Sequence, residues 1–171
     1  PLSICNSLSV IVHSEFLKNL VNKILIDKSY YLNLPSNISK PYNNYIYKKV
    51  NNEYVNIIIF GYISTNRYVI ETINILLKNK FKNKYFLHIV GSISSHEVLN
   101  FIKKNPKVVK YHGFLQECEL NSLMSQMNFC INIRNPSVGE TSASILRCWS
   151  SKLLCVVRDT KSFKELSDKS V

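Results

Sequence analysis

The chain has 171 residues, 46% of them apolar, and a formal net charge of +11. This length and apolar content are typical of one globular domain with a sizeable core, and they exclude a disordered chain. No apolar run comes near the roughly 18 residues of a transmembrane helix. The segment from Pro1 to Cys5 lacks the basic and apolar parts of a signal peptide. Because the chain starts with proline and stops at Val171 after a short helical pattern, we expect it to be cut at both ends.

The five cysteines do not form any Cys-x-x-Cys pair, and the four histidines are scattered. A zinc site is therefore not favoured, and we expect no metal. Cys130 and Cys155 lie in apolar runs, so we expect them to be small buried hydrophobic residues. Reduced thiols and a cytoplasmic protein are the corresponding expectation.

Lysines cluster at residues 48–49, 78–84 and 103–110. One interpretation is attraction to polyanions, either nucleic acid or anionic lipid. The other is a compositional habit, because the chain is also rich in Asn and Ile and its lysines fall mostly at predicted helix ends and loops, where solvated charge is normal. We favour the second interpretation, with a general attraction to anionic surfaces.

The first predicted unit is a strand followed by a helix. Residues Leu8–Val12 are a continuous apolar run, and Glu15–Ile26 has apolar residues at helical spacing, with Ser14 as its expected N-cap. His13 lies between the two elements. It either lines a cleft or is a structural histidine, and the second interpretation is favoured in the absence of a known partner.

A Tyr-, Asn- and Pro-rich segment separates this unit from the rest of the chain. It predicts a linker with a short strand at Tyr30–Leu34, after which Pro35 and Pro41 break the pattern. Its tyrosines would suit base stacking in a single-strand nucleic-acid binder, but no sheet-forming repeats accompany them, so that function is not favoured. We therefore divide the chain into residues 1–27, a linker at 28–52 and a domain at 53–171.

The clearest buried strand is Tyr54–Phe60, which Gly61 ends. A loop follows, and then a long amphipathic helix is predicted from about Arg67 to Phe81. Strand, loop and helix in this order form the first unit of a doubly wound sheet, in which ligands bind at the loops outside the carboxyl ends of the strands. Arg67 lies near the helix start, where the helix dipole disfavours a cation, so an anionic ligand would explain its position.

The same alternation continues along the chain. The next predicted elements are a strand at Tyr85–Val90, a helix with a capping box at Ser94, a strand at Lys107–Tyr111 and a helix at Glu117–Gln126. Strands that alternate with helices predict a Rossmann-like parallel α/β sheet with helices on both faces. The sequence contains no Walker-type loop and no Gly-x-Gly-x-x-Gly, which disfavours an NTPase and a dinucleotide oxidoreductase.

The last predicted unit is a strand at Met127–Ile133, a loop, a helix and a strand at Leu153–Val157. Its helix N-terminus would lie at the carboxyl edge of the sheet, and outward-pointing N–H groups there bind phosphate or another anion. Glu140 stabilises the helix dipole but would repel a phosphate unless it faces sugar hydroxyls. The alternative is an ordinary Ser/Thr-rich helix start that Glu140 caps. Three hydroxyls would add donors to the anion site: those of Thr141, Ser142 and Ser144.

Three segments of the chain, Val138–Arg147, Ser151–Asp159 and Phe163–Leu166, resemble the donor-binding half of glycosyltransferase family 4, whose members have the two Rossmann-like domains of the GT-B arrangement. In the similar subgroup the loop reads Gly-Glu-Thr-Ser-Gly, and here Ala143 stands in place of the last glycine. The resemblance runs over the whole chain. It implies that residues 53–171 are the C-terminal nucleotide-sugar-binding domain, truncated at its end, and that residues 1–27 are the last strand and helix of an otherwise absent acceptor domain.

The resemblance also implies roles for single residues. Arg67 falls on a lysine position that contacts the donor diphosphate, and Tyr62 falls where many members have a second arginine. Glu140 would orient the donor sugar, and Cys148 stands where many members have a glutamate that binds the ribose. The turn around Phe114 would meet the base, although a place in the core is an equal alternative for this side chain. With Glu140 and Arg67 as the catalytic residues, the implied donor-binding residues are Gly61, Tyr62, Gly113, Phe114, Leu115, Gly139, Thr141, Ser142 and Ser144.

The implied activity is a retaining transfer from a UDP- or GDP-sugar to a glycan or lipid-linked acceptor, without a metal or other cofactor. Arg67 and the helix start at Glu140 would hold one diphosphate from the same sheet edge. The fragment alone would be inactive, and its lysines would allow peripheral contact with the inner face of an anionic membrane. Two alternatives stay open. One is an inactive homologue that still binds nucleotide sugars, favoured by Tyr62 and Cys148, and the other is a basic module that binds nucleic acid or anionic membrane.

Overall fold

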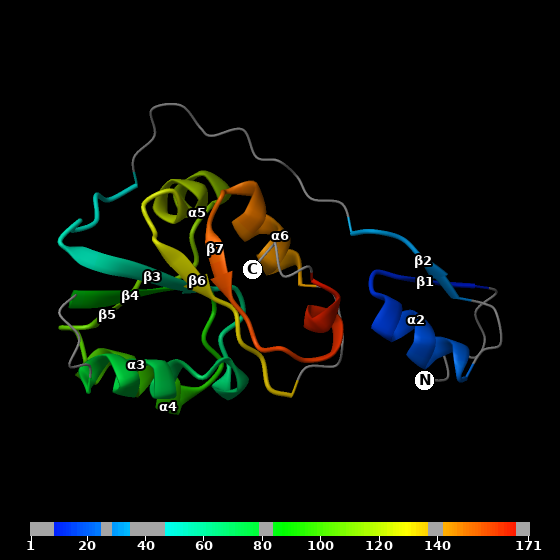
Figure 1. Cartoon of the computed structure of the whole chain (residues 1–171). Helices are drawn as coiled ribbons and strands as arrows, with labels where there is room; N and C mark the ends of the chain where they lie inside the picture. Colours follow the sequence, from blue (N-terminus) through cyan, green and yellow to red (C-terminus); the bar gives the residue numbers. More distant parts are fainter. Residues whose placement is uncertain (1–8, 25–28, 35–46, 79–83, 137–141, 167–171) are drawn as a thin grey trace.

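The computed structural model describes residues 9–24, 29–34, 47–78, 84–136 and 142–166. Its main part is a five-stranded sheet in which all neighbouring strands are parallel, in the order β5-β4-β3-β6-β7 (Figure 1). This order is that of a Rossmann-like sheet, and it places the reversal of strand order between β3 and β6. The predicted fold class is therefore confirmed. The strands are β3 (Tyr54–Phe60), β4 (Lys84–Val90), β5 (Val109–Tyr111), β6 (Phe129–Ile131) and β7 (Leu154–Val156).

Helices cover both faces of this sheet. In Figure 1, α3 (Val69–Leu77) and α4 (His96–Lys104) lie on one side, and α5 (Glu117–Met124) and α6 (Ala143–Ser150) lie on the other. The central strand β3 is apolar on both faces, as expected of a buried parallel strand. Its Ile57 and Ile59 pack with the α3 and α4 residues, whereas Ile58 and Phe60 pack with those of α5 and α6. The alternation of side chains along β3 thus gives the protein two hydrophobic cores.

The long helix predicted from Arg67 is shorter than expected and starts later. A 3₁₀ turn, η1 (Thr65–Arg67), comes first, and α3 begins only at Val69. The reason is Tyr68, whose φ of 54° lies in the left-handed region, so that the chain changes direction between η1 and α3. Arg67 therefore lies near the start of α3, as expected, but in η1 and outside the helix itself.

The caps of two helices can be compared directly with prediction. The Ser14 hydroxyl accepts a hydrogen bond of 3.1 Å from the N–H of Leu17, so this predicted N-cap is confirmed. At α4 the cap is Ser95, whose hydroxyl accepts from the N–H of Val98 at 3.3 Å. The prediction of Ser94 is therefore wrong by one residue, because several neighbouring hydroxyl side chains present the same local signal.

The N-terminal residues form a small β-α-β unit beside the C-terminal segment (Figure 1). It consists of β1 (Val10–Val12), α2 (Glu15–Asn22) and β2 (Ser29–Tyr31), and its two strands are parallel. The carboxylate of Glu165, at the end of η2 (Lys161–Glu165), accepts hydrogen bonds from the first N–H groups of α2 at 3.0 and 2.6 Å. A carboxylate at a helix N-terminus is stabilising, so this contact ties the unit to the main domain.

His13 has a structural partner within this unit. Its Nδ1 donates to the carbonyl oxygen of Leu32 at 2.7 Å, which fits the structural interpretation of this residue. His13 also lines a small cavity together with Ser142 and Glu165. No helix in the described part of the chain is long and apolar enough to cross a bilayer.

His88 of β4 and His112, which follows β5, form a hydrogen-bonded pair in which both rings are neutral at pH 7. His88 Nε2 lies 3.1 Å from the Asn56 side-chain oxygen, which can only accept, so Nε2 carries the proton. His88 Nδ1 therefore accepts from Nε2 of His112, 3.0 Å away. Both rings also border a small cavity with Lys48 and Lys110. Protonation of His88 would set two N–H groups against each other.

Lowering the pH from 7 toward 4 is therefore expected to destabilise the protein. Burial, and then the charge of Lys110, lower the pKa of His88 from 6.5 to about 4, and burial is also the main cause that lowers the pKa of His112 to about 4. Below pH 6.5 the unfolded chain binds protons that the folded chain does not, so this stability is complete above pH 6.5 and is lost as the pH falls to about 4. For His88 alone the loss is on the order of 3 kcal/mol.

Urea unfolding at several pH values between 4 and 7 tests this expectation. Titrating carboxylates contribute to the same curve, so the informative quantity is the difference between the native chain and the His88→Gln variant. The glutamine amide can reach the position of Nε2 and keep a hydrogen bond to Asn56, but it does not titrate. The variant should lose less stability than the native chain over this range, and equal losses would contradict the assignment.

Candidate functional site

A cavity of about 750 Å³ lies at the carboxyl ends of the central strands. Four separate segments line it: the turn after β3, the turn after β4, the turn after β5 together with the first turn of α5, and the first turns of α6. In sheets of this kind the carboxyl edge is where ligands bind. The volume is also typical of a small-molecule site. The residues that line the cavity are Phe60, Gly61, Tyr62, Val90, Gly91, Ser92, Phe114, Leu115, Gln116, Glu117, Leu120, Ala143, Ser144, Leu146 and Arg147.

Backbone hydrogen bonds hold the turns of the cavity floor together. The N–H of Gly61 donates to the carbonyl oxygen of Val90 at 3.0 Å, and the N–H of Gly91 donates to that of Gly113 at 2.7 Å. Gly61 and Gly91 have φ values of 105° and 120°, which only glycine adopts readily. Backbone hydrogen bonds thus fix the ends of three strands to one another, and the Tyr111 hydroxyl adds a bond to the carbonyl oxygen of Gly91 at 2.8 Å.

Two exposed aromatic rings stand at the cavity. Tyr62 is 68% exposed and Phe114 is 76% exposed, although both line the cavity. The alternative that Phe114 belongs to the core is therefore wrong, and its neighbour Leu115, 7% exposed, takes that place. Successive residues of an extended turn point to opposite sides, which the sequence alone leaves undecided. An exposed ring beside a cavity is suited to stack against the flat face of a nucleic-acid base.

The start of α6 contributes free backbone donors. Ala143 and Ser144 open the helix and line the cavity, and the first N–H groups of a helix have no partner within it. Ser142 is the N-cap, but its side chain makes no capping bond and is buried. Instead its hydroxyl accepts from the side-chain nitrogen of Asn132 at 3.0 Å. The predicted site residues Gly139, Glu140 and Thr141 lie outside the described residues.

Arg67 is buried behind the cavity and does not line it. Its side chain is 3% exposed, and it donates to the side-chain oxygen of Asn132 at 2.8 Å and to the carbonyl oxygen of Phe60 at 2.9 Å. Burial first, and then the charge of Arg134, lower the pKa of Arg67 to about 10, so it stays protonated at neutral pH. Through Asn132 it is linked to Ser142. Arg67 therefore lies at the same sheet edge as the start of α6, but below the surface.

The cavity wall carries an ion pair that the sequence did not predict. Arg147 Nη2 lies 3.0 Å from an Oε atom of Glu117, and both residues line the cavity. The pair joins α6 to the first turn of α5. Helical spacing could have indicated Arg147, which follows Ser144 by three residues and so shares its face. Nothing in the sequence indicates Glu117, because its approach to Arg147 depends on how the two helices pack.

Cys148, at the position where the resemblance implies a ribose-binding glutamate, points away from the cavity. Its side chain is completely buried between α6 and the sheet. A carboxylate reaches the cavity from another position, because Glu117 lines it. A carboxylate in such a position accepts hydrogen bonds from sugar hydroxyls.

No protein-family model matches this sequence, and no curated protein matches it either. Solved structures do match its fold. Superposition on TarM of S. aureus, solved with UDP and α-GlcNAc-glycerol, gives a TM-score of 0.70 at 15% identity, over 93% of this chain and 31% of TarM. For HepE of Anabaena, solved with UDP and glucose, the TM-score is 0.70 at 12% identity, over 98% of this chain and 48% of HepE.

A third similar structure is WaaG, a glycosyltransferase involved in lipopolysaccharide biosynthesis, with a TM-score of 0.64 at 10% identity. The match covers 91% of this chain and 45% of WaaG. The chain thus spans less than half of each of these three proteins. At these identities the likeness concerns the fold, which is the Rossmann-like fold that the strand order already gives.

Proposed function

We propose that this chain is the donor-binding part of a glycosyltransferase and that a nucleoside-diphosphate sugar binds in the cavity at the carboxyl edge of the sheet. The observation that carries the proposal is the convergence of four sequence-distant segments on one cavity of about 750 Å³, which exposed rings and a helix N-terminus both line. A nucleotide sugar needs both features, because its base is flat and its diphosphate is anionic. The similar folds of TarM and HepE, solved with UDP, support the same ligand class.

Each part of the ligand has its own place in this proposal. The base, from a UDP- or GDP-sugar, lies against the turn of Phe114 and Leu115. The diphosphate faces the free N–H groups at the start of α6, where the helix dipole and backbone donors stabilise its charge. Arg67 contributes its charge from beneath the site and positions the start of α6 through Asn132 and Ser142.

The remaining roles follow from the chemistry of the groups. The Glu117 carboxylate accepts from the ribose hydroxyls, in place of the glutamate that the resemblance implies at residue 148. Glu140 orients the donor sugar, and stabilisation of the leaving diphosphate by fixed donors lowers the barrier to transfer. The acceptor is a glycan or another lipid-linked acceptor, the anomeric configuration is retained, and no metal takes part in the transfer.

Ala143→Asp is expected to weaken the binding of UDP by about tenfold or more, which corresponds to about 1.4 kcal/mol. Ala143 is exposed and is the first residue of α6, so an aspartate there stabilises the helix while its charge repels the diphosphate. Isothermal titration calorimetry with UDP, GDP and their sugars measures the loss of affinity. The same titrations show whether the cavity prefers uracil or guanine.

His96→Asp is the matched control for this variant. His96 is exposed and is the first residue of α4, so the same acidic residue is placed at the same helix position but outside the cavity. The affinity of the His96→Asp variant for UDP should equal that of the native chain. Equal affinity in Ala143→Asp and the native chain would show that the diphosphate does not bind at α6.

Salt dependence separates this proposal from the basic-module alternative. A net charge of +11 would give RNA or anionic vesicles a steep loss of affinity with salt. Nucleotide binding in the cavity depends on a few fixed hydrogen-bond donors, so the affinity for the nucleotide should change much less between low and physiological salt. RNA or vesicle binding without nucleotide binding would favour the basic module. Nucleotide binding without transfer by the intact protein would favour the inactive homologue.

A further inference from the structure

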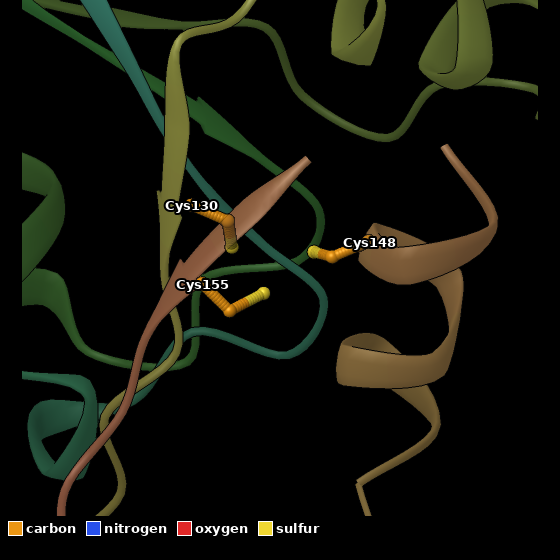
Figure 2. A group of neighbouring side chains, drawn as sticks. All are labelled: Cys130, Cys148 and Cys155. Carbon is orange, nitrogen blue, oxygen red and sulfur yellow. The ribbon is translucent and has the colours of Figure 1, made fainter. Parts of the chain in front are cut away.

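Three cysteines from separate parts of the sequence meet beneath α6. Cys130 and Cys155 are directly paired residues of β6 and β7, so their side chains leave the same face of the sheet. Cys148 lies on α6, which covers that face. Figure 2 shows the three side chains pointing toward one another. Their Sγ atoms all lie within 4.8 Å of one another, which is close enough for one ion to contact all three.

The surroundings of these sulfurs are apolar and closed. The three side chains are between 0% and 7% exposed, and they belong to one hydrophobic cluster with Ile145 and Leu153. In the part of the chain that the structure describes, no histidine or carboxylate joins the group.

Arg67 is a buried cation near these sulfurs. Arg67 is bonded to Asn132 and to a carbonyl oxygen, and among the described residues no carboxylate pairs with it and its Nε has no hydrogen-bond partner. Asn132 follows Cys130 by two residues and so lies on the same face of the sheet. The charge of Arg67 interacts with Cys130 and Cys148. A buried charge without a partner is costly, and thiolates in this place would offset it.

We propose that Cys130, Cys148 and Cys155 form a three-coordinate site for a soft, thiophilic cation, namely copper(I). Thiolate sulfur selects soft ions such as copper(I) and zinc. Structural zinc takes four protein ligands, and the described residues supply only three here, in a pocket closed to water. Copper(I) accepts three thiolates, and Arg67 offsets part of the resulting negative charge.

Binding is an exchange of protons for metal. Each thiol that coordinates copper(I) releases its proton to solvent, the copper stays monovalent, and no electron is transferred. None of the three sulfurs lines the large cavity, so the ion has a structural role. It connects α6 to β6 and β7 and so fixes the helix whose first turn forms part of the cavity wall. The site does not depend on the proposed transferase function.

Competition for copper(I) against a coloured copper(I) chelator, under anaerobic and reducing conditions, tests the proposal. The native chain should take up one copper per chain, show thiolate-to-copper charge-transfer absorption in the ultraviolet, and unfold at a higher temperature with copper than without. Cys148→Ala and Cys155→Ala should each lose this uptake. Near-ultraviolet circular dichroism establishes that each variant is folded. If one of the two variants does not fold, the other still tests the proposal.

The matched control removes the two cysteines outside the group. Cys118 is a free, partly buried thiol, and Cys5 lies outside the described residues, so a chain with both replaced by alanine keeps only the proposed ligands. It should bind copper(I) as the native chain does. X-ray absorption at the copper edge should then show three sulfur neighbours. Absence of uptake, uptake that survives in Cys148→Ala, or displacement of copper by zinc(II) would overturn the proposal.

Discussion

Gly91→Ala is expected to destabilise the protein by about 4 kcal/mol or more, which is enough to unfold a marginally stable domain. Two independent reasons support this magnitude. The φ of Gly91 is 120°, a conformation that an alanine adopts only with strain. A Cβ placed there would also lie 1.9 Å from the carbonyl oxygen of Gly61, which is backbone and cannot rotate away. Thermal or urea unfolding measures the loss.

Gly113→Ala is the control for this prediction. Its φ of 71° also lies in the left-handed region, but a Cβ there would have nothing within 4 Å. Only the conformational strain remains, at about 1–2 kcal/mol. The difference between the two variants reports the clash between the turns after β3 and β4 together with the greater strain of an alanine at a φ of 120°. Equal losses would mean that these turns do not approach as closely as described, and the cavity floor would then have a different shape.

Asn132→Leu is expected to destabilise the protein by about 3–5 kcal/mol, because it leaves a buried charge poorly bonded. Asn132 is completely buried and accepts from Arg67 while it donates to Ser142. A leucine can do neither. Since Ser142 directly precedes α6, the same variant should also weaken UDP binding at the start of that helix. Urea unfolding and calorimetry measure the two effects.

The double variant Arg67→Met, Asn132→Leu decides whether the charge is the cause. If the penalty of Asn132→Leu comes from an unpaired guanidinium, removal of that guanidinium should restore part of the stability. The double variant should then be more stable than Asn132→Leu alone, although it carries one substitution more. A double variant that is less stable than Asn132→Leu would show that the two side chains contribute mainly through packing.

The sequence by itself was sufficient for the architecture. Strands such as Tyr54–Phe60 are long apolar runs between turn residues, and helix periodicity alternates with them, so the parallel α/β sheet follows from local pattern. Element ends were less certain. The start of α3 was misplaced because Tyr68 adopts a left-handed conformation that the local pattern does not indicate, and the cap of α4 was misplaced because neighbouring serines carry the same signal.

The sequence predicted only part of the candidate site. Gly61 and Ser144 could be identified as cavity residues from local signals, namely a glycine turn after a strand and a hydroxyl at a helix start. Tyr62, Phe114 and Leu115 could be identified only through the family resemblance. The burial of the Arg67 side chain and the approach of Glu117 to Arg147 could not, because each depends on contacts between elements far apart in the chain.

The order of strands and helices was therefore determined by the sequence, since hydrophobic periodicity and turn residues act over a few residues at a time. Tertiary structure decided which side chains meet. Cysteines 130, 148 and 155 have no metal-binding spacing in the sequence, yet strand pairing and the packing of α6 bring their sulfurs within 4.8 Å. Such groupings depend on long-range register and helix packing, which local pattern does not encode.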